Sequence, residues 1–367
     1  MSLEYMREAL ALARQGLGRT SPNPAVGAVV VQGDEVVGRG FHTWAGVKHA
    51  EVLALEEAGA RARGATLYVT LEPCAHQGRT PPCTEALIAA GVARVVAAME
   101  DPNPLVAGAG LKRLRQAGIQ AELAPEFAAE AARLNEAYVH YMRTGLPLVT
   151  LKAALTLDGK IAAPEDNQGW ITSERARAHV QQVRHLSDAI LTGIGTVLAD
   201  DCLLTDRTGL ERSRPLKRVV LDSQLRMPLN SRMVQSACGD VLVVTTSAAP
   251  AERRRALEAR GIQVLALDGP NGRTDLPALV RHLGRERYLS LMIEAGSKVN
   301  WTALECAVAD RILFYYAPKI LGGMRSLPVA GGAGRRSRRE ALRFRNLRLE
   351  MITEEEFAVE AYLIKEA

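Results

Sequence analysis

The stretch LEPCAHQGRTPPC, from Leu71 to Cys83, sets the fold of the N-terminal half of this chain. It places two cysteines in one Pro-rich loop, between a strand that we expect over residues 65–71 and a helix that we expect over about 82–90. A second stretch, KHAEVLAL, begins at Lys48 and opens a further helix. Together the two stretches offer one imidazole and two thiolates, which are ligands that Zn²⁺ prefers in proteins. The sequence therefore predicts a zinc site with three ligands: His49, Cys74 and Cys83.

The predicted zinc site has the features of a catalytic centre. Three protein ligands leave the fourth position of a tetrahedral zinc ion open for water, and zinc lowers the pKa of that water to about 7. Glu51 follows His49 by two residues and is expected to carry protons as general acid and base, as in the H-x-E signature of zinc nucleobase deaminases. The alternative is a closed structural zinc site, in which His42 or His76 supplies a fourth ligand.

The spacing of the two cysteines differs from that of the general deaminase signature. Eight residues, rather than two, lie between Cys74 and Cys83. A gap of this length forms a loop over the site, and we expect its side chains, His76 and Arg79 among them, to contact the substrate. The sequence therefore favours hydrolytic removal of an amino group from a ring.

Length and composition limit the class of protein. A chain of 367 residues, 47% hydrophobic and 24% charged, is expected to form two globular domains. Its five cysteines are few and odd in number, which argues against a disulfide scaffold and for a reducing, cytoplasmic location. No apolar run approaches the ~18–20 residues of a membrane span. The net charge of +5 suits anionic small substrates and does not require nucleic acid.

The first half of the chain is predicted to alternate strands and helices. A helix over residues 2–16 precedes a hairpin over 25–40 that turns at Gly33-Asp34. Strands and helices then follow one another up to a single long helix over about 126–143. This order of elements indicates a sheet with helices on both faces.

The second half repeats the alternation after a linker. The stretch RTGLPL, at 143–148, is typical of a linker, and it divides the chain into domains 1–145 and 146–367. In the second domain we expect short apolar strands separated by helices, with Ser173 as the N-cap of one helix and a hairpin near the end. Gly296 ends a predicted strand and opens a helix, where backbone N–H groups suit a phosphate.

The motifs of the first half resemble a known family. EPCAHQGRTPPC, HAE and SPNPAVGAVVV are similar to the deaminase domain of the bifunctional riboflavin-biosynthesis deaminase/reductases. The resemblance implies a cytidine-deaminase-like, three-layer α/β/α domain that removes the amino group from diaminohydroxyphosphoribosylaminopyrimidine. It also implies one zinc ion per chain and substrate contacts by Asn23, His42, His76 and Asn103. Without the resemblance, Asn23 and Asn103 are equally well explained as turn residues between prolines.

The second half resembles the reductase domain of the same family. The matching stretches are LKAALTLDGKIA, GWITSERAR, AILTGIGTVLADDCLLTDR and IEAG. The resemblance implies a dihydrofolate-reductase-like α/β domain that uses NADPH to reduce the ribose of the deaminated product to a ribityl chain, and a homodimer. The implied cofactor contacts are Ala154, Trp170, Thr196, Asp200, Ser223 and Gly296. The implied substrate contacts are Gln168, Arg184, Leu204, Arg207 and Glu294.

Lys152 and Glu294 are the candidate catalytic residues of the second half. Both fall on predicted strands, where a charge is costly unless it is paired or faces a cleft. Hydride transfer to a sugar carbon needs a proton donor or a charged partner nearby, which such residues can supply. Without the resemblance, Trp170 would be a core residue and Arg184 a solvated helix residue. The run RRSRR, Arg335 to Arg339, is predicted to be a solvated loop.

Two other functions fit part of the sequence. A nucleoside or tRNA deaminase with an unrelated appended domain would share the zinc motif. A non-catalytic, zinc-stabilised RNA-binding module would share the ligands but would close the metal site with a fourth one. Loop residues such as Arg79 argue against the first alternative.

Overall fold

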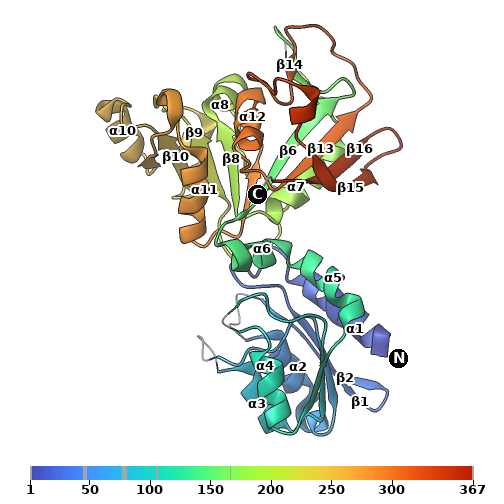
Figure 1. Cartoon of the computed structure of the whole chain (residues 1–367). Coiled ribbons are helices and arrows are strands. Elements are labelled where there is room, and N and C mark those ends of the chain that lie inside the picture. Colours follow the sequence, from blue (N-terminus) through green and yellow to red (C-terminus); the bar gives the residue numbers. More distant parts are fainter. Residues whose placement is uncertain (1, 44–47, 77–80, 105, 166, 366–367) are drawn as a thin grey trace. The chain divides into compact units, whose positions relative to one another are not determined.

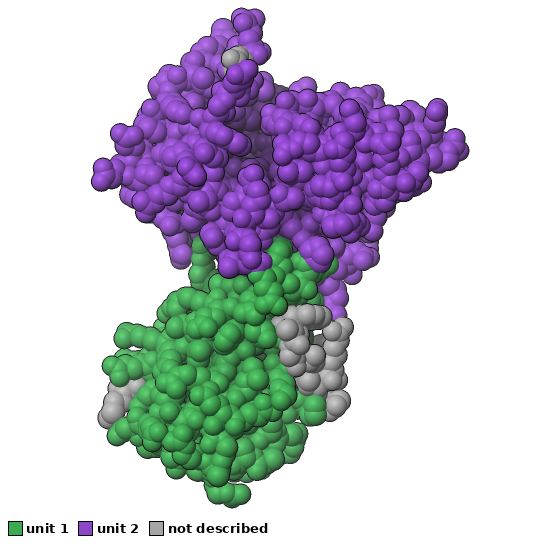
Figure 2. Space-filling model, turned by 180° about the vertical axis from the view of Figure 1, so that it is seen from behind, with its two compact units in different colours: residues 1–145, 211–214 green, residues 146–210, 215–367 purple. Residues whose placement is uncertain are grey.

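The computed structural model describes residues 2–43, 48–76, 81–104, 106–165 and 167–365 (Figure 1). The chain divides into two compact units, which Figure 2 shows in different colours. Unit 1 comprises residues 1–145 with 211–214, and unit 2 comprises residues 146–210 with 215–367. Among the described residues, no helix is both long enough and apolar enough to cross a membrane.

Unit 1 is built on a five-stranded sheet with the strand order β2-β1-β3-β4-β5. The first three strands in this order are antiparallel, and β3, β4 and β5 are parallel. Its strands are β1 (Gly27–Gln32), β2 (Glu35–Phe41), β3 (Thr66–Val69), β4 (Arg94–Ala97) and β5 (Gln120–Leu123). Its α-helices are α1 (Ser2–Gln15), α2 (Ala50–Ala58), α3 (Cys83–Ala90), α4 (Ala109–Gln116), α5 (Pro125–Leu134) and α6 (Glu136–Thr144). The predicted hairpin with its turn at Gly33-Asp34 is confirmed.

Helices cover both faces of this sheet, which gives three layers (Figure 1). One face packs against α1 and α5 through Met6, Leu10, Val29 and Phe127. On the other face, β2 lies so close to α2 that a Cβ on Gly40 would lie 2.2 Å from the Ala50 carbonyl oxygen. Glycine at this position therefore fixes where α2 begins, and α2 carries the residues of the zinc motif.

The prediction of one long helix over 126–143 was wrong. The helix is interrupted at Asn135, which has φ −105° and ψ 27° and separates α5 from α6. The buried side chain of Asn135 hydrogen-bonds the backbone of Ala25 instead of lying along a helix surface. Asparagine favours such local breaks because its amide competes with the helical hydrogen bonds of the backbone.

Unit 2 is built on a nine-stranded sheet with the strand order β11-β10-β9-β8-β12-β6-β13-β16-β15. The strands from β11 to β13 in this order are parallel, and β16 and β15 continue the sheet as an antiparallel hairpin. The strands of the sheet are β6 (Leu148–Thr156), β8 (Ala189–Gly193), β9 (Lys217–Leu221), β10 (Val241–Thr245), β11 (Gln263–Ala266), β12 (Ser290–Ile293), β13 (Arg311–Ala317), β15 (Phe344–Met351) and β16 (Phe357–Leu363). A separate two-stranded ladder pairs β7 (Lys160–Ala162) with β14 (Leu327–Pro328).

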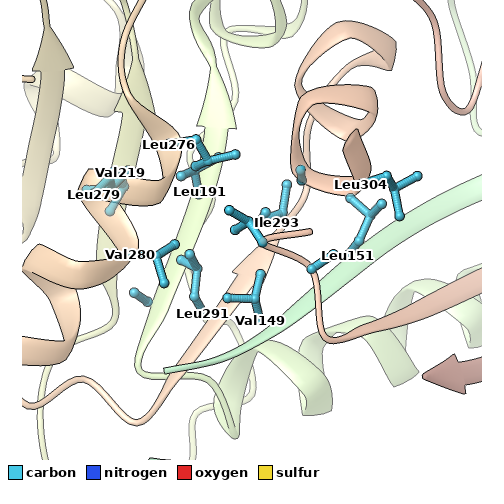
Figure 3. Packing of buried hydrophobic residues seen from close by; sticks show 14 of the residues in the cluster. Val149, Leu151, Leu191, Val219, Leu276, Leu279, Val280, Leu291, Ile293 and Leu304 are labelled. Carbon is cyan, nitrogen blue, oxygen red and sulfur yellow. The ribbon is translucent and has the colours of Figure 1, made fainter. Parts of the chain in front are cut away.

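Two buried clusters cover the two faces of this sheet. Figure 3 shows one face, where Val149 and Leu151 of β6 pack against residues of α11 and α12 such as Leu279 and Leu304. The other face packs against α7, α8 and α10, for example through Val180. The helices of this unit are α7 (Glu174–His185), α8 (Ile194–Asp200), α9 (Arg232–Gln235), α10 (Ala251–Glu258), α11 (Leu276–Arg285) and α12 (Ser297–Glu305).

The helix ends of unit 2 match the sequence predictions. Ser173 is the N-cap of α7, and its hydroxyl accepts a hydrogen bond from the Ala176 N–H at 3.2 Å. Gly296 is the N-cap of α12. The run from Arg335 to Arg339 is exposed throughout, as predicted.

Candidate active sites

The three predicted zinc ligands come together in unit 1. His49 is the N-cap of α2, Cys83 is the first residue of α3, and Cys74 lies in the loop after β3. The Nδ1 atom of His49 lies 3.0 Å from the Sγ atom of Cys83 and 3.6 Å from that of Cys74. The ligand atoms all lie within 4.8 Å of one another, and the cluster contains no fourth histidine, cysteine or acid from the described residues. All five cysteines are described and are free thiols.

One of the two sulfur atoms is prepared to hold a cation, since the hydrogen bond between the two side chains lowers the pKa of Cys74 and raises the pKa of Cys83. Cys83 hydrogen-bonds Cys74 with its side chain and donates its backbone N–H to the Cys74 sulfur at 3.3 Å, which lowers the pKa of the Cys74 thiol to about 4. A thiolate is the form of cysteine that binds a metal. One imidazole nitrogen and two sulfurs at these distances therefore fit Zn²⁺ by both chemistry and geometry.

Glu51 lies next to this cluster in a dry environment. Its side chain is only 4% exposed in the first turn of α2, and burial raises the pKa of its carboxyl group to about 7, although His49 opposes that shift. The carboxyl group also hydrogen-bonds the Cys83 side chain. A carboxyl group whose pKa is near neutrality can both accept and release a proton at physiological pH.

His42 is buried beside the cluster but is held by other partners. Its ring lies edge-on to that of His49, with 5.3 Å between the ring centroids. Its Nδ1 atom lies 3.1 Å from the Lys48 carbonyl oxygen, and its Nε2 atom lies 3.2 Å from the Asn23 amide nitrogen. Because a carbonyl only accepts, Nδ1 carries the proton and Nε2 accepts from Asn23. Both ring nitrogens are thus engaged, which disfavours His42 as a fourth metal ligand.

The remaining predicted substrate residues of unit 1 lie in loops. His76 is exposed at the end of the described part of the cysteine loop, and Arg79 falls outside the described residues. Asn103 is partly buried, and its backbone N–H donates to the Asp101 carboxylate at 2.9 Å.

In unit 2, three predicted residues form one buried ion cluster. The Lys152 Nζ atom lies 2.9 Å from one oxygen of the Glu294 carboxylate, and the Arg184 guanidinium lies 2.9 Å from the other. Arg184 also donates to the Thr205 carbonyl at 3.1 Å. Burial raises the pKa of Glu294, but the two cations outweigh that effect and lower it to about 2. Arg184 is therefore not a solvated helix residue, because its charge is paired inside the unit.

The sheet register explains this cluster. Ile293 of β12 pairs with Leu151 of β6, so the next residues on both strands, Glu294 and Lys152, lie side by side. Side chains alternate between the two faces of a strand, so Lys152 points away from the core that contains Leu151. Arg184 comes from α7, which covers that opposite face.

Three of the six predicted cofactor residues lie at the carboxyl ends of parallel strands. Thr196, Ser223 and Gly296 follow β8, β9 and β12, which are neighbours or near neighbours in the sheet. A Cβ on Gly296 would lie 3.9 Å from the Thr196 hydroxyl, so these two positions are close together. Crevices at the carboxyl ends of parallel strands are the usual binding sites of nucleotides in such sheets.

Three further predicted cofactor residues lie elsewhere in unit 2. Ala154 lies on β6 beside Tyr315, on the same face as Lys152. Asp200 ends α8 and is exposed, although partial burial raises the pKa of its carboxyl group. Trp170 is 68% exposed, so its interpretation as a core residue was wrong. Its ring lies 4.8 Å from the Arg177 guanidinium carbon.

The predicted substrate residues Leu204, Arg207 and Gln168 lie in loops of unit 2. Leu204 is buried with a φ of 53°, whereas Arg207 and Gln168 are exposed. The loop that carries Leu204 and Arg207 is fastened to α7, since the Arg207 N–H donates to the Gln181 side chain at 2.9 Å. His185 of α7 and Asp206 of the loop form a further buried contact at 2.9 Å.

Comparisons with known proteins identify both units. The sequence profile of the cytidine and deoxycytidylate deaminase zinc-binding region matches residues 1–99, and that of the RibD C-terminal domain matches residues 147–356. The riboflavin biosynthesis protein RibD of Actinobacillus pleuropneumoniae is 42% identical over 96% of this chain and 93% of its own length. The chain belongs to the RibD family of riboflavin biosynthesis proteins.

Other members of the RibD family give the same result. The Escherichia coli RibD is 44% identical over 88% of this chain and 90% of its own length. An Acinetobacter baumannii RibD structure matches with a TM-score of 0.88 at 38% identity and covers 99% of this chain and 98% of its own. A Thermotoga maritima structure named as a diaminohydroxyphosphoribosylaminopyrimidine deaminase/5-amino-6-(5-phosphoribosylamino)uracil reductase matches with a TM-score of 0.84 at 34% identity and covers 98% of both chains.

Membership in the RibD family confirms the predicted fold class and the bifunctional activity. The chain is an enzyme of riboflavin biosynthesis with an N-terminal, cytidine-deaminase-like domain and a C-terminal reductase domain, and its substrates are small pyrimidines. A deaminase with an unrelated appended domain is not favoured, because the RibD profile covers the second half. A non-catalytic RNA-binding module is not favoured either.

Sequence reasoning missed the buried polar residues that support the RibD sites. Glu72, which directly precedes Pro73-Cys74, accepts four backbone N–H groups from residues 101–111. Asn135 and Tyr138 hydrogen-bond other loops of unit 1. The only signal in the sequence was the presence of a polar residue inside an otherwise regular pattern, and such a residue is more often exposed than buried.

Proposed function

We propose that unit 1 deaminates 2,5-diamino-6-(5-phosphoribosylamino)pyrimidin-4-one and that unit 2 then reduces the ribosyl chain of 5-amino-6-(5-phosphoribosylamino)uracil with NADPH. The observation that carries this proposal is the cluster of His49, Cys74 and Cys83 beside the buried Glu51, in a chain whose other half matches the RibD reductase domain. The name of the Thermotoga maritima relative, similar over 98% of this chain, supports the substrates.

His49, Cys74 and Cys83 would hold one zinc ion per chain. Their donor atoms suit this metal, and the Cys83 N–H favours the thiolate form of Cys74. Zinc bound there supplies a Lewis acid that activates water for attack on carbon. The protein contributes the proton transfers, which are the task of Glu51.

Glu51 acts as the proton carrier of the deamination. As a carboxylate it takes a proton from the water that attacks the ring carbon bearing the amino group. It then delivers that proton to the adjacent ring nitrogen, and a second proton transfer releases the amino group as ammonia while the ring carbon becomes a carbonyl. The buried position of Glu51 beside the proposed ligands suits it to both transfers.

Loops around the cluster bind the pyrimidine and its phosphoribosyl group. Asn23 uses its amide nitrogen on His42, so its amide oxygen is the atom that can accept a hydrogen bond from a substrate amino group. We assign further substrate contacts in the same way to His76, Arg79 and Asn103. The positive side chain of Arg79 suits the phosphate of the substrate.

Lys152 is the proposed proton donor of the reduction. NADPH, when bound, supplies the hydride that reduces C1′ of the ring-opened sugar. Lys152 holds a proton at Nζ and gives it to the nitrogen on C1′, while Glu294 fixes the position of Lys152. The substrate contacts are Gln168, Arg184, Leu204, Arg207 and Glu294, and the charges of Arg184 and Arg207 suit the phosphate.

The carboxyl edge of the parallel strands is the proposed NADPH site. The first turn of α12 follows Gly296 without a side-chain cap, so its N–H groups are suited to a phosphate of the cofactor. Ala154, Trp170, Thr196, Asp200 and Ser223 complete the proposed site. The exposed Trp170 offers a flat ring for stacking.

We further propose that the chain forms a homodimer through β15. This strand is the last one in the order of the nine-stranded sheet. Leu347, Leu349 and Met351 alternate along it and are 68%, 58% and 56% exposed. Apolar side chains on one face of an edge strand favour burial against another subunit. Light scattering of the wild type and of Leu349→Lys tests this proposal, since we expect a dimer and a weakened dimer, respectively.

The test of the two activities follows ammonia and NADPH in one reaction. With the diaminopyrimidine substrate, ammonia release should begin at once, and NADPH oxidation should start only after a lag. With the deamination product, 5-amino-6-(5-phosphoribosylamino)uracil, as substrate, the lag in NADPH oxidation should disappear. Oxidation of NADPH without prior ammonia release, or no ammonia release at all, would contradict the proposal.

A further inference from the structure

We infer that Asn135 and Tyr138 are positioning residues for the deamination, because they hold the two loops that carry Asn23 and Asn103. The inference rests on the proposed function, which assigns these two asparagines to the substrate. Asn135 interrupts the helical segment before α6, and Tyr138 lies three residues later in the first turns of α6. Both are buried polar residues that belong neither to the zinc cluster nor to the proposed substrate contacts.

Asn135 holds the loop that precedes β1. Its Oδ1 atom accepts the Ala25 N–H, and its Nδ2 atom donates to the Ala25 carbonyl, both at 2.8 Å. Ala25 follows Asn23 by two residues in a segment without regular secondary structure. The side-chain amide of Asn135 therefore pairs with both the N–H and the carbonyl of Ala25, as a neighbouring strand would in a sheet.

Tyr138 holds the loop that contains Asn103. Its hydroxyl donates to the Asp101 carboxylate at 3.2 Å, and the same carboxylate oxygen accepts the Asn103 N–H at 2.9 Å. The other side of this loop is bound by Glu72, which accepts the Asp101 N–H at 3.2 Å and precedes Cys74 by two residues. The position of Asn103 is thus fixed between α6 and the strand end that leads to Cys74.

A shared helix gives these contacts a common consequence. Asn135 is the N-cap of α6 and Tyr138 lies in its first turn, so the start of one helix reaches both loops. The two loops come from parts of the sequence about eighty residues apart, and a fixed spacing between them would fix the spacing of Asn23 and Asn103. If a contact is lost, the binding-competent arrangement becomes a smaller fraction of the population, and the apparent affinity for substrate falls by that fraction.

Two variants test the inference. Asn135→Asp keeps an acceptor for the Ala25 N–H, but it replaces the donor to the Ala25 carbonyl with an oxygen that the carbonyl oxygen repels. We therefore expect the KM of deamination to rise about 10–100-fold. Tyr138→Phe removes only the hydroxyl, so we expect a rise of about 3–10-fold. In both variants the zinc content should stay at one per chain. Reduction of the deaminated uracil should be unchanged, because unit 2 is intact.

Tyr5→Phe is the matched control. It also removes a tyrosine hydroxyl from unit 1, but that hydroxyl donates to the Asp34 carbonyl in the β1–β2 turn at 2.9 Å. We expect a change in KM of less than about 2-fold. The thermal unfolding midpoint of every variant is measured as well, and the kinetics are recorded well below the lowest one.

The outcomes separate the inference from the proposed function. An unchanged KM in both variants, with only a lower unfolding midpoint, means that these residues are merely structural and overturns the inference. An equal loss of deamination and reduction overturns it as well, because it points to global unfolding. If Asn135→Asp does not fold, the KM of Tyr138→Phe alone decides whether the inference holds. A wild type that releases no ammonia instead overturns the proposed function and, with it, this inference.

Discussion

The two proposed active sites of this enzyme are assembled over very different sequence distances. In unit 1, the proposed zinc cluster joins His49 to Cys83, which are 34 residues apart, and each of its residues lies in a short recognisable motif. In unit 2, the ion cluster joins Lys152 to Glu294, which are 142 residues apart, and neither residue lies in a motif whose chemistry is evident without the family resemblance. The first site depends on the chemical identity of its residues. The second depends on the register of a sheet.

This difference has an energetic basis. A metal site needs particular donor atoms, so its residues are chemically restricted and are visible in one sequence. A buried ion cluster needs only that opposite charges meet in a dry environment, and several residue types can satisfy that need. Lys152 and Glu294 were nevertheless predictable as a class, because an unpaired charge on a buried strand is costly.

Removal of the metal should produce the largest difference between the two sites, because it should affect deamination and not reduction. Treatment with a strong chelator should abolish deamination, while reduction of the deaminated uracil remains, because only unit 1 contains the His49, Cys74 and Cys83 cluster. The measurement is the rate of each half-reaction alongside the zinc content. Added zinc should restore deamination. Parallel loss of both activities would contradict the assignment of the metal to unit 1 alone.

The next largest effect on activity is expected from two substitutions, one in each unit, that should each impair a different half-reaction. Glu51→Gln removes the proton carrier, so kcat for deamination should fall about 10²–10⁴-fold while zinc content and reduction are kept. Glu294→Gln makes the same chemical change in unit 2, and it should impair reduction while deamination is kept. Steady-state kinetics of both half-reactions check the pair. Full deaminase activity in Glu51→Gln would remove Glu51 from the mechanism.

The pH dependence of stability should distinguish the ion cluster of unit 2. The pKa of Glu294 is lowered to about 2 in the folded chain, from an ordinary value near 4.5. This stabilisation is therefore present above about pH 4.5 and is lost as the pH falls toward 2. Its side chain is 23% exposed, so we expect about 1–3 kcal/mol.

Denaturant unfolding of the wild type and of Glu294→Gln, from pH 7 to pH 3, measures this contribution. Both chains carry the same unit 1, so the difference between their curves isolates Glu294. The difference should shrink as the pH falls. A difference that is constant with pH would mean that the charge of Glu294 does not stabilise unit 2.

Gly40→Ala should change stability about as much as the loss of the Glu294 charge, and it tests the close packing behind the zinc motif. The added Cβ would lie 2.2 Å from the Ala50 carbonyl oxygen, so the start of α2, with His49 and Glu51, must move. We expect a loss of about 1–3 kcal/mol in the free energy of unfolding and a lower kcat for deamination. The matched control is Gly195→Ala in unit 2, where the Cβ would meet no atom within 4 Å. That control should change stability by less than about 1 kcal/mol.

Most strands and helices were predictable from sequence, but the break at Asn135, the helix α9 and the β7–β14 ladder were not. The β1–β2 hairpin, the N-cap at Ser173 and the helix after Gly296 follow from local turn and capping chemistry. The helix break at Asn135 was not predicted, because the apolar pattern continues through it. Its cause is a hydrogen bond to Ala25, a residue 110 positions earlier.

The candidate sites show the same limit. The functional roles implied by the family resemblance stay predictions, and the surroundings of several of these residues did not follow from the sequence. Without the family resemblance, Trp170 would have been placed in the core and Arg184 in solvent, but Trp170 is exposed and Arg184 is buried. The hydrophobicity and the charge of a side chain indicate whether it prefers the core or solvent. Its interaction partners in the folded chain decide where it lies.

The sequence by itself predicted the proposed metal ligands, the proposed proton carrier and the two α/β folds, because each prediction depends on residue identity or on spacing within one short stretch. Only the tertiary structure decided which charges pair in unit 2 and which residues hold the loops of unit 1. Those contacts join positions up to 142 residues apart. They depend on strand register and helix packing, which arise from the whole chain and which no local pattern encodes.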